Sequence, residues 1–166
     1  MPSKGVESSN TALKPGTPAP DFTLKASRDK KVSLKEYLGR KVILVFYPAD
    51  FSPVCSDQLA LYNELLSEFR RYNAEVVAIS VDNVWSHIAF ASDRKISFPL
   101  LSDFEPKGAV SKLYGVYKEE RGYSERALFI IDEEGVIRWS YVSPTNVNPG
   151  ADGILNALEE LESRKK

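Results

Sequence analysis

Hydrophobic residues occur along the chain in two patterns, as continuous runs and at spacings of three or four. Residues 42–47 are apolar throughout and rich in β-branched side chains, which predicts a strand covered on both faces. Residues 75–81, with an apolar stretch from Val76 to Ile79, predict a second buried strand. Between these runs, apolar side chains recur at helical spacing and predict one long amphipathic helix that ends near Arg71. Its apolar positions are Leu59, Tyr62, Leu65, Leu66, Phe69 and Tyr72.

The next part of the chain alternates between shorter helices and strands. We expect a helix over residues 84–94, a short strand over 98–101, and a helix over 107–114 that ends at Gly115.

Two later apolar runs, residues 127–131 and 136–139, flank a polar turn, which is the signal of a β-hairpin. A final helix is expected over residues 152–163. Its inward-facing side chains are Ile154, Leu158 and Leu161. This order of elements predicts an α/β fold with a mixed central sheet and helices on both faces. It is the plan of a thioredoxin-like fold with an extra α/β insertion.

The N-terminal part carries weaker signals. Residues 1–13 are small and polar and are expected to form a flexible arm, and residues 14–166 a single domain. Residues 21–24 predict a short edge strand. Residues 32–34 predict the end of another strand, and 37–39 one helical turn.

Charge and composition exclude several function classes. The 166 residues contain 22 Lys and Arg against 23 Asp and Glu, and this balance argues against binding of nucleic acid, which needs a basic excess. No apolar run approaches the roughly 18 residues that a membrane span requires, and the N-terminus lacks the apolar segment of a secretory signal. The single cysteine, Cys55, forbids an internal disulfide and suits a reducing cytoplasm, which is the expected location.

Cys55 lies where a buried strand gives way to a helix. Ser52 is a preferred N-cap residue and Pro53 a preferred first helical residue, so Cys55 is expected in the first helical turn. There the free backbone N–H groups and the helix dipole favour a thiolate over a thiol. The Ser52 hydroxyl could reach the N–H or the sulfur of Cys55. The carboxylate of Asp57, two residues further on, would disfavour the thiolate.

Other interpretations of these residues remain open. Free cysteines are often small buried hydrophobic residues, so Cys55 could be structural in a non-catalytic thioredoxin-like binding or chaperone module. A thiol–disulfide oxidoreductase is excluded because Ser52 stands where the first cysteine of a Cys-x-x-Cys pair would be. His87 has no second His or acidic neighbour at metal spacing, so no metal site is expected, and His87 would face solvent or make a polar contact.

The pattern Pro48-x-x-x-Ser52-x-x-Cys55 resembles the active site of peroxiredoxins, the alkyl hydroperoxide reductase and thiol-specific antioxidant superfamily. The resemblance extends over about residues 15–160. Its further blocks are residues 78–82, 98–103, 110–116 and 126–132. With its single cysteine, the chain looks most like the one-cysteine members.

The resemblance implies a role for each matching residue. Cys55 would attack a hydroperoxide as a thiolate and become a sulfenic acid. Ser52 would hydrogen-bond the thiolate or the peroxide, Pro48 would shield the sulfur from water, and Arg126 would stabilise the developing charge. Backbone N–H groups at the helix start, those of Val54 and Cys55, would complete the substrate site. No metal or organic cofactor is implied, and without the resemblance Arg126 would be expected at the surface.

The chain also departs from the family pattern. Many relatives carry a second cysteine five residues after the first, but this position is Ala60 and the chain has no other cysteine. An external thiol, such as thioredoxin, glutaredoxin or a low-molecular-weight thiol, would therefore have to reduce the sulfenic acid. Gln58 stands where the family often has Glu. The resemblance further implies a homodimer.

Overall fold

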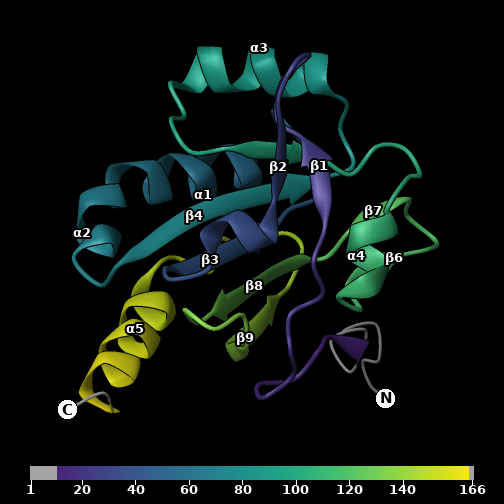
Figure 1. Ribbon diagram of the computed structural model, residues 1–166. Coiled ribbons are helices and arrows are strands. Elements are labelled where there is room, and N and C mark those ends of the chain that lie inside the picture. Colours follow the sequence, from purple (N-terminus) through teal and green to yellow (C-terminus); the bar gives the residue numbers. More distant parts are fainter. Residues whose placement is uncertain (1–10, 165–166) are drawn as a thin grey trace, which may run out of the picture.

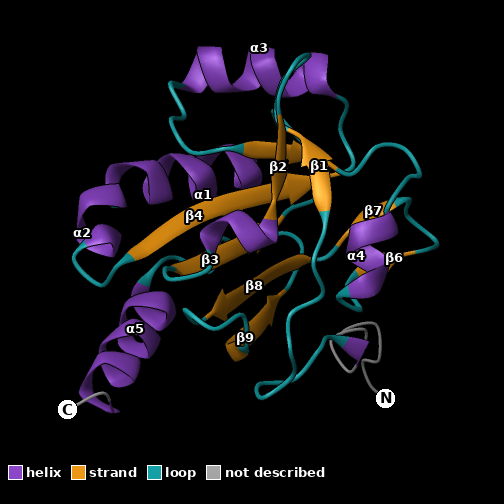
Figure 2. Ribbon diagram, in the orientation of Figure 1, coloured by secondary structure: helices purple, strands orange, loops and turns teal. Residues whose placement is uncertain are grey.

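A mixed seven-stranded sheet forms the centre of the protein in the computed structural model, which describes residues 11–164 (Figures 1 and 2). Its strand order is β2-β1-β5-β4-β3-β8-β9. The strands are β1 (Thr23–Lys25), β2 (Lys31–Ser33), β3 (Lys41–Phe46), β4 (Ala74–Ser80), β5 (Leu100–Ser102), β8 (Arg126–Ile131) and β9 (Ile137–Ser143). β3, β4 and β5 run parallel, whereas β8 is antiparallel to β3 and pairs with β9 as the predicted hairpin.

Helices cover both faces of this sheet, as the sequence predicts. They are α1 (Pro53–Glu64), α2 (Leu66–Arg70), α3 (Val84–Arg94), α4 (Ala109–Leu113) and α5 (Asp152–Arg164), with a short 3₁₀ helix, η2 (Leu34–Tyr37). In Figure 1, α5 and α4 lie on opposite sides of the sheet. Among residues 11–164, no helix has the length and apolar character needed to cross a membrane.

The core has two parts because alternate residues of each strand point to opposite faces. Ile43 and Val45 of β3 belong to one buried cluster, together with side chains of α1, α2, α3 and α5. Val42 and Leu44 belong to the other, which includes Val110 of α4. Both clusters cover the continuous apolar run of β3, whose six residues are all buried.

The structure corrects two element predictions. The long helix is interrupted at Leu65, which has φ −100° and ψ 10° and separates α1 from α2. The apolar spacing continues across this break, so the hydrophobic pattern does not reveal it. The predicted edge strand is also misplaced: β1 lies between β2 and β5, and β2 is the outer strand. A turn in which Ala26 N–H bonds to the Lys30 carbonyl returns the chain to the outer side of β1.

A small hairpin of β6 (Tyr117–Lys118) and β7 (Tyr123–Ser124) precedes β8. We did not expect it, since two-residue strands are too short to produce a hydrophobic period.

The predicted flexible arm is only partly described, because residues 1–10 lie outside the described chain. Its last residues, 11–13, are packed: Ala12 is buried, and the Leu13 N–H donates to the Tyr114 carbonyl. At Gly115, with φ +76°, a Cβ atom would lie 1.9 Å from the carbonyl oxygen of Thr11. The packed domain therefore begins by residue 11 rather than at residue 14.

Candidate active site

Cys55 occupies the first turn of α1, directly after the loop of residues 47–52 that joins β3 to this helix, the β3–α1 loop. Ser52 caps the helix as predicted, and its Oγ accepts a hydrogen bond from the Cys55 N–H at 3.3 Å. Pro53 is the first helical residue. The side chain of Cys55 is fully buried. Burial alone would suit a structural cysteine, so the polar neighbours of the sulfur decide between the two interpretations.

The closest charged neighbour of the sulfur is Arg126, the first residue of β8. Antiparallel pairing of Phe46 with Ala127 brings the start of β8 beside the end of β3, where the chain turns toward α1. The Arg126 Nη1 thereby lies 3.2 Å from the Cys55 Sγ. Arg126 is 2% exposed, so the expectation of a surface position, made without the resemblance, is wrong.

The guanidinium of Arg126 is held by neutral oxygens. Nε and Nη2 donate to the Thr145 carbonyl at 2.9 and 2.6 Å, and Nη1 donates to the Gln58 Oε1 at 2.9 Å. None of the ion pairs found among the described residues includes Arg126. A buried charge without a counter-ion is costly, and an anionic sulfur at Cys55 would supply one.

The amide of Gln58 is oriented by Tyr62, four residues later on the same helix. The Gln58 Nε2 donates to the Tyr62 hydroxyl at 3.1 Å, which leaves the amide oxygen to face Arg126. The hydroxyl in turn donates to the Gly150 carbonyl at 2.9 Å. Burial raises the pKa of Tyr62 to about 12, so the hydroxyl keeps the proton that it donates. Sequence reasoning missed Tyr62 and Thr145; only the spacing of Gln58 and Tyr62 could have indicated a contact.

The remaining predicted residues lie around this centre. Pro48 is buried in the β3–α1 loop, and Val54 is half-buried as the second residue of α1. The first N–H groups of a helix have no partner within it, so the Val54 N–H is available to an anion or an oxygen atom. Asp57 is exposed, where solvent screens its charge from the sulfur.

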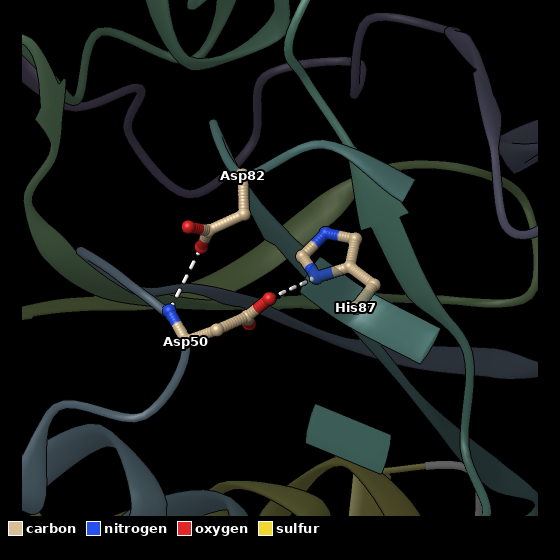
Figure 3. Close-up of side chains that lie close together, drawn as sticks. All are labelled: Asp50, Asp82 and His87. Atoms are coloured by element: carbon tan, nitrogen blue, oxygen red, sulfur yellow. Dashed lines mark hydrogen bonds and ion pairs between the residues drawn. The ribbon is translucent and has the colours of Figure 1, made fainter. Parts of the chain in front are cut away.

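A second buried polar cluster lies behind the β3–α1 loop (Figure 3). The Asp50 Oδ2 lies 2.8 Å from the His87 Nδ1, and its Oδ1 accepts a 2.6 Å hydrogen bond from the Tyr47 hydroxyl. The His87 Nε2 lies 3.0 Å from the Leu101 carbonyl oxygen. His87 is 2% exposed, so of the two expectations for it, the polar contact is right and solvent exposure is wrong.

The fold thus gives His87 two acidic neighbours, Asp82 from just before α3 and Asp50, which is 37 residues away in sequence. Ligand atoms of Asp50, Asp82 and His87 lie within 4.8 Å of one another, the arrangement of a candidate metal centre. These atoms already have partners, however: the Asp82 Oδ2 accepts from the Asp50 N–H at 2.8 Å and from the Ser80 hydroxyl at 2.6 Å. Both nitrogens of His87 are also in contact with oxygen atoms. The cluster is a hydrogen-bonded network, and we assign no metal to it.

Comparison with known proteins agrees with the resemblance noted in the sequence. Residues 15–140 match the model of the AhpC/TSA family. The chain is 39% identical over 158 residues to "2-Cys peroxiredoxin BAS1, chloroplastic" from Spinacia oleracea, a match that covers 89% of this chain and 59% of that protein. It is 41% identical over 129 residues to "Alkyl hydroperoxide reductase E" from Mycobacterium tuberculosis, with 77% and 84% covered.

The fold is likewise similar to solved structures. The crystal structure of Enterococcus faecalis AhpC has a TM-score of 0.83 and 31% identity, covering 91% of this chain and 93% of that one. The chain spans only 59% of the length of its chloroplastic relatives from Spinacia oleracea and Arabidopsis thaliana. It also differs from relatives named for two cysteines, since its sequence contains Cys55 alone.

Proposed function

We propose that this chain, which belongs to the AhpC/TSA family of peroxiredoxins, is a thiol-dependent peroxidase that reduces hydrogen peroxide and alkyl hydroperoxides at Cys55. The observation that carries the proposal is the 3.2 Å contact between the Cys55 Sγ and the Arg126 guanidinium. A structural thiol needs no buried cation, whereas a thiolate nucleophile does.

The proposed reaction begins with the Cys55 thiolate. Its sulfur attacks one peroxide oxygen, an S–O bond forms, and the O–O bond breaks with its electron pair going to the departing oxygen. That oxygen takes a proton from solvent and leaves as water or an alcohol. The sulfur is thereby oxidised to a sulfenic acid and the peroxide is reduced.

Neighbouring groups would stabilise the negative charge as it moves from sulfur to oxygen. Arg126 donates toward the sulfur and is positioned to follow the charge onto the peroxide. The Ser52 hydroxyl and the N–H groups of Val54 and Cys55 would hold the peroxide oxygens, and Pro48 would keep water away.

Regeneration would require an external thiol, because the sequence has no second cysteine. A first thiol attacks the sulfenic acid, releases water and forms a mixed disulfide with Cys55. A second thiol then displaces the protein thiolate as a new disulfide forms. Thioredoxin, glutaredoxin or a low-molecular-weight thiol would serve. A reducing cytoplasm, our proposed location, maintains such thiols.

We also propose that the protein forms a homodimer. Three large apolar side chains, one of them in the β3–α1 loop, are exposed, and burial in an interface would remove them from water. Phe51 contacts Phe90 of α3 and is 46% exposed, while Trp85 and Phe104 are 63% and 50% exposed and line one cleft. Light scattering after size exclusion tests this, and a monomeric mass at micromolar concentration would overturn it.

The decisive experiment mixes reduced protein with one equivalent of hydrogen peroxide in a stopped-flow instrument. Tryptophan fluorescence follows the rate, and mass spectrometry with a sulfenate trap identifies the oxidised residue. We expect oxidation far faster than that of a free thiol, with the label on Cys55, and complete loss of turnover in Cys55→Ser. An inert Cys55 in the folded protein would favour a non-catalytic module with a structural cysteine instead.

A further inference from the structure

The carboxylate of Asp50, in the β3–α1 loop, is surrounded by hydrogen-bond donors. The Tyr47 hydroxyl donates to its Oδ1 at 2.6 Å, and the Ser86 hydroxyl donates to its Oδ2 at 2.8 Å. The His87 Nδ1 lies 2.8 Å from the same Oδ2. Two hydroxyl donors stabilise an ionised carboxylate, which can only accept hydrogen bonds. The short contact with His87 then requires a proton on Nδ1.

The other ring nitrogen of His87 requires a proton as well. The Nε2 lies 3.0 Å from the carbonyl oxygen of Leu101 in β5, and a carbonyl oxygen is an acceptor only. Tyr47 cannot supply the proton at Nδ1, since its hydroxyl is 3.4 Å from this nitrogen and spends its one proton on Asp50. Burial, followed by the nearby Asp50 charge, raises the pKa of Tyr47 well above its usual range, so the phenol remains a donor. A ring that donates at both nitrogens is an imidazolium.

Helix α3 holds the β3–α1 loop at a strained residue. Phe51 has φ +68°, a left-handed conformation that is unfavourable for a bulky residue and persists only when its surroundings enforce it. Two contacts from α3 flank it: His87 and Ser86 hold Asp50, and the ring of Phe90 lies 5.1 Å from that of Phe51.

We propose that the His87 imidazolium, paired with Asp50, is a positioning group for the peroxidatic cysteine. The pair fixes the β3–α1 loop, and the loop places Ser52, the cap of the helix that carries Cys55. This inference rests on the proposed peroxidase function. A neutral ring could donate to Asp50 or to the Leu101 carbonyl but not to both, so loss of the proton would release one side of the loop.

The groups that face the imidazole come from several elements. Tyr47 and Asp50 belong to the β3–α1 loop, Asp82 follows β4, Ser86 belongs to α3, and a carbonyl oxygen comes from β5. Among the described residues around the ring, two carboxylates therefore face one imidazolium. Both favour the charged ring.

The protonation state can be read directly because His87 is the only histidine in the sequence. Long-range ¹H–¹⁵N correlation of ¹⁵N-labelled protein at pH 7 reports which of the two ring nitrogens carry a proton. We expect two protonated nitrogens in the native protein. A neutral ring with its proton on Nε2 alone would overturn the proposal.

A second experiment separates charge from contact. In Asp50→Asn, the new amide NH₂ can donate to a neutral Nδ1 and its oxygen can still accept from Tyr47, so the loop keeps its contacts while the ring loses its counter-ion. We expect the rate of Cys55 oxidation to stay within about threefold of the native rate at pH 7. In His87→Gln, which cannot bridge both acceptors, it should fall by about tenfold to a hundredfold. Ile88→Ala, an exposed change on α3, is the matched control.

The pH dependence completes the test. Above the pH at which the correlation spectra show the native ring losing its proton, the ratio of native to Asp50→Asn oxidation rates should fall, because only the native loop depends on that proton. A constant ratio, or a native rate in His87→Gln, overturns the positioning role. If native Cys55 itself is not oxidised rapidly, the proposed function fails instead, and the two failures are distinguishable.

Discussion

One buried polar cluster includes Asp50 of the β3–α1 loop and another includes Cys55 of the helix that follows it, and the two balance their charges in opposite ways. Around Asp50, the carboxylate meets an imidazole and two hydroxyl protons, so its charge is compensated within the protein. Around Cys55, the Arg126 guanidinium meets only carbonyl oxygens and the sulfur. A carboxylate whose charge is already balanced by protein groups stabilises the local structure and interacts only weakly with a further ligand. An uncompensated cation retains its field for an anion, which is what a thiolate and a breaking O–O bond require.

Removing the Arg126 cation should have the largest effect on the rate of Cys55 oxidation. Arg126→Ala should lower the second-order rate of Cys55 oxidation by about 10²–10³, the usual cost of losing a donor to developing charge. Arg126→Lys should recover part of it, because an ammonium keeps the charge but lacks the fork that bonds Thr145 and the sulfur together. Stopped-flow rates measure this, and circular dichroism checks that both variants fold. An undiminished rate in a folded Arg126→Ala protein would contradict the role of the guanidinium.

A smaller change would make the Cys55 cluster resemble the Asp50 cluster. Gln58→Glu places a carboxylate where a neutral oxygen now accepts from Arg126 at 2.9 Å. The guanidinium would then be paired within the protein, and the new charge would oppose the thiolate. The family often has Glu at this position, so the change tests whether this chain depends on the neutral amide. We expect the oxidation rate at pH 7 to fall by about tenfold.

Its control is Asp57→Asn on the same helix, which alters an exposed carboxylate and should leave the rate near the native value. If Gln58→Glu oxidises as fast as the native protein, a neutral partner for Arg126 is not a requirement of the site.

The sequence predicts one side of this comparison better than the other, for physical reasons. The helix cap of Cys55 is local chemistry, and Ser52 and Pro53 indicate it without any knowledge of the fold. The buried strands are also predictable, because β3 is apolar from Val42 to its end. The contact of Arg126 with the sulfur depends on strand pairing across 71 residues and came only from the family resemblance.

The Asp50 cluster could not be predicted in this way. Asp50 and His87 are 37 residues apart in sequence. They meet because Asp50 lies in the β3–α1 loop and His87 lies on α3, which contacts this loop. In sequence each is an ordinary polar residue. Only the folded structure shows that both ring nitrogens of His87 lie within hydrogen-bond distance of oxygen atoms.

The smallest kinetic effect should come from Tyr62→Phe, which leaves every charge in place. Without the hydroxyl, the Gln58 amide and the Gly150 carbonyl each lose a partner, so stability should fall by about 1–3 kcal/mol and the oxidation rate only a few-fold.

The variant should also change how the stability of the protein depends on pH. Burial raises the pKa of Tyr62 to about 12, so between about pH 10 and 12 the unfolded chain loses this proton while the folded chain keeps it. The native protein therefore loses stability over this interval, and Tyr62→Phe should lose less. Urea unfolding at pH 8 and pH 10.5 measures the difference, with the exposed Tyr141→Phe as control. Equal losses of stability in all three proteins would show that the folded chain does not hold the Tyr62 proton more tightly than the unfolded chain does.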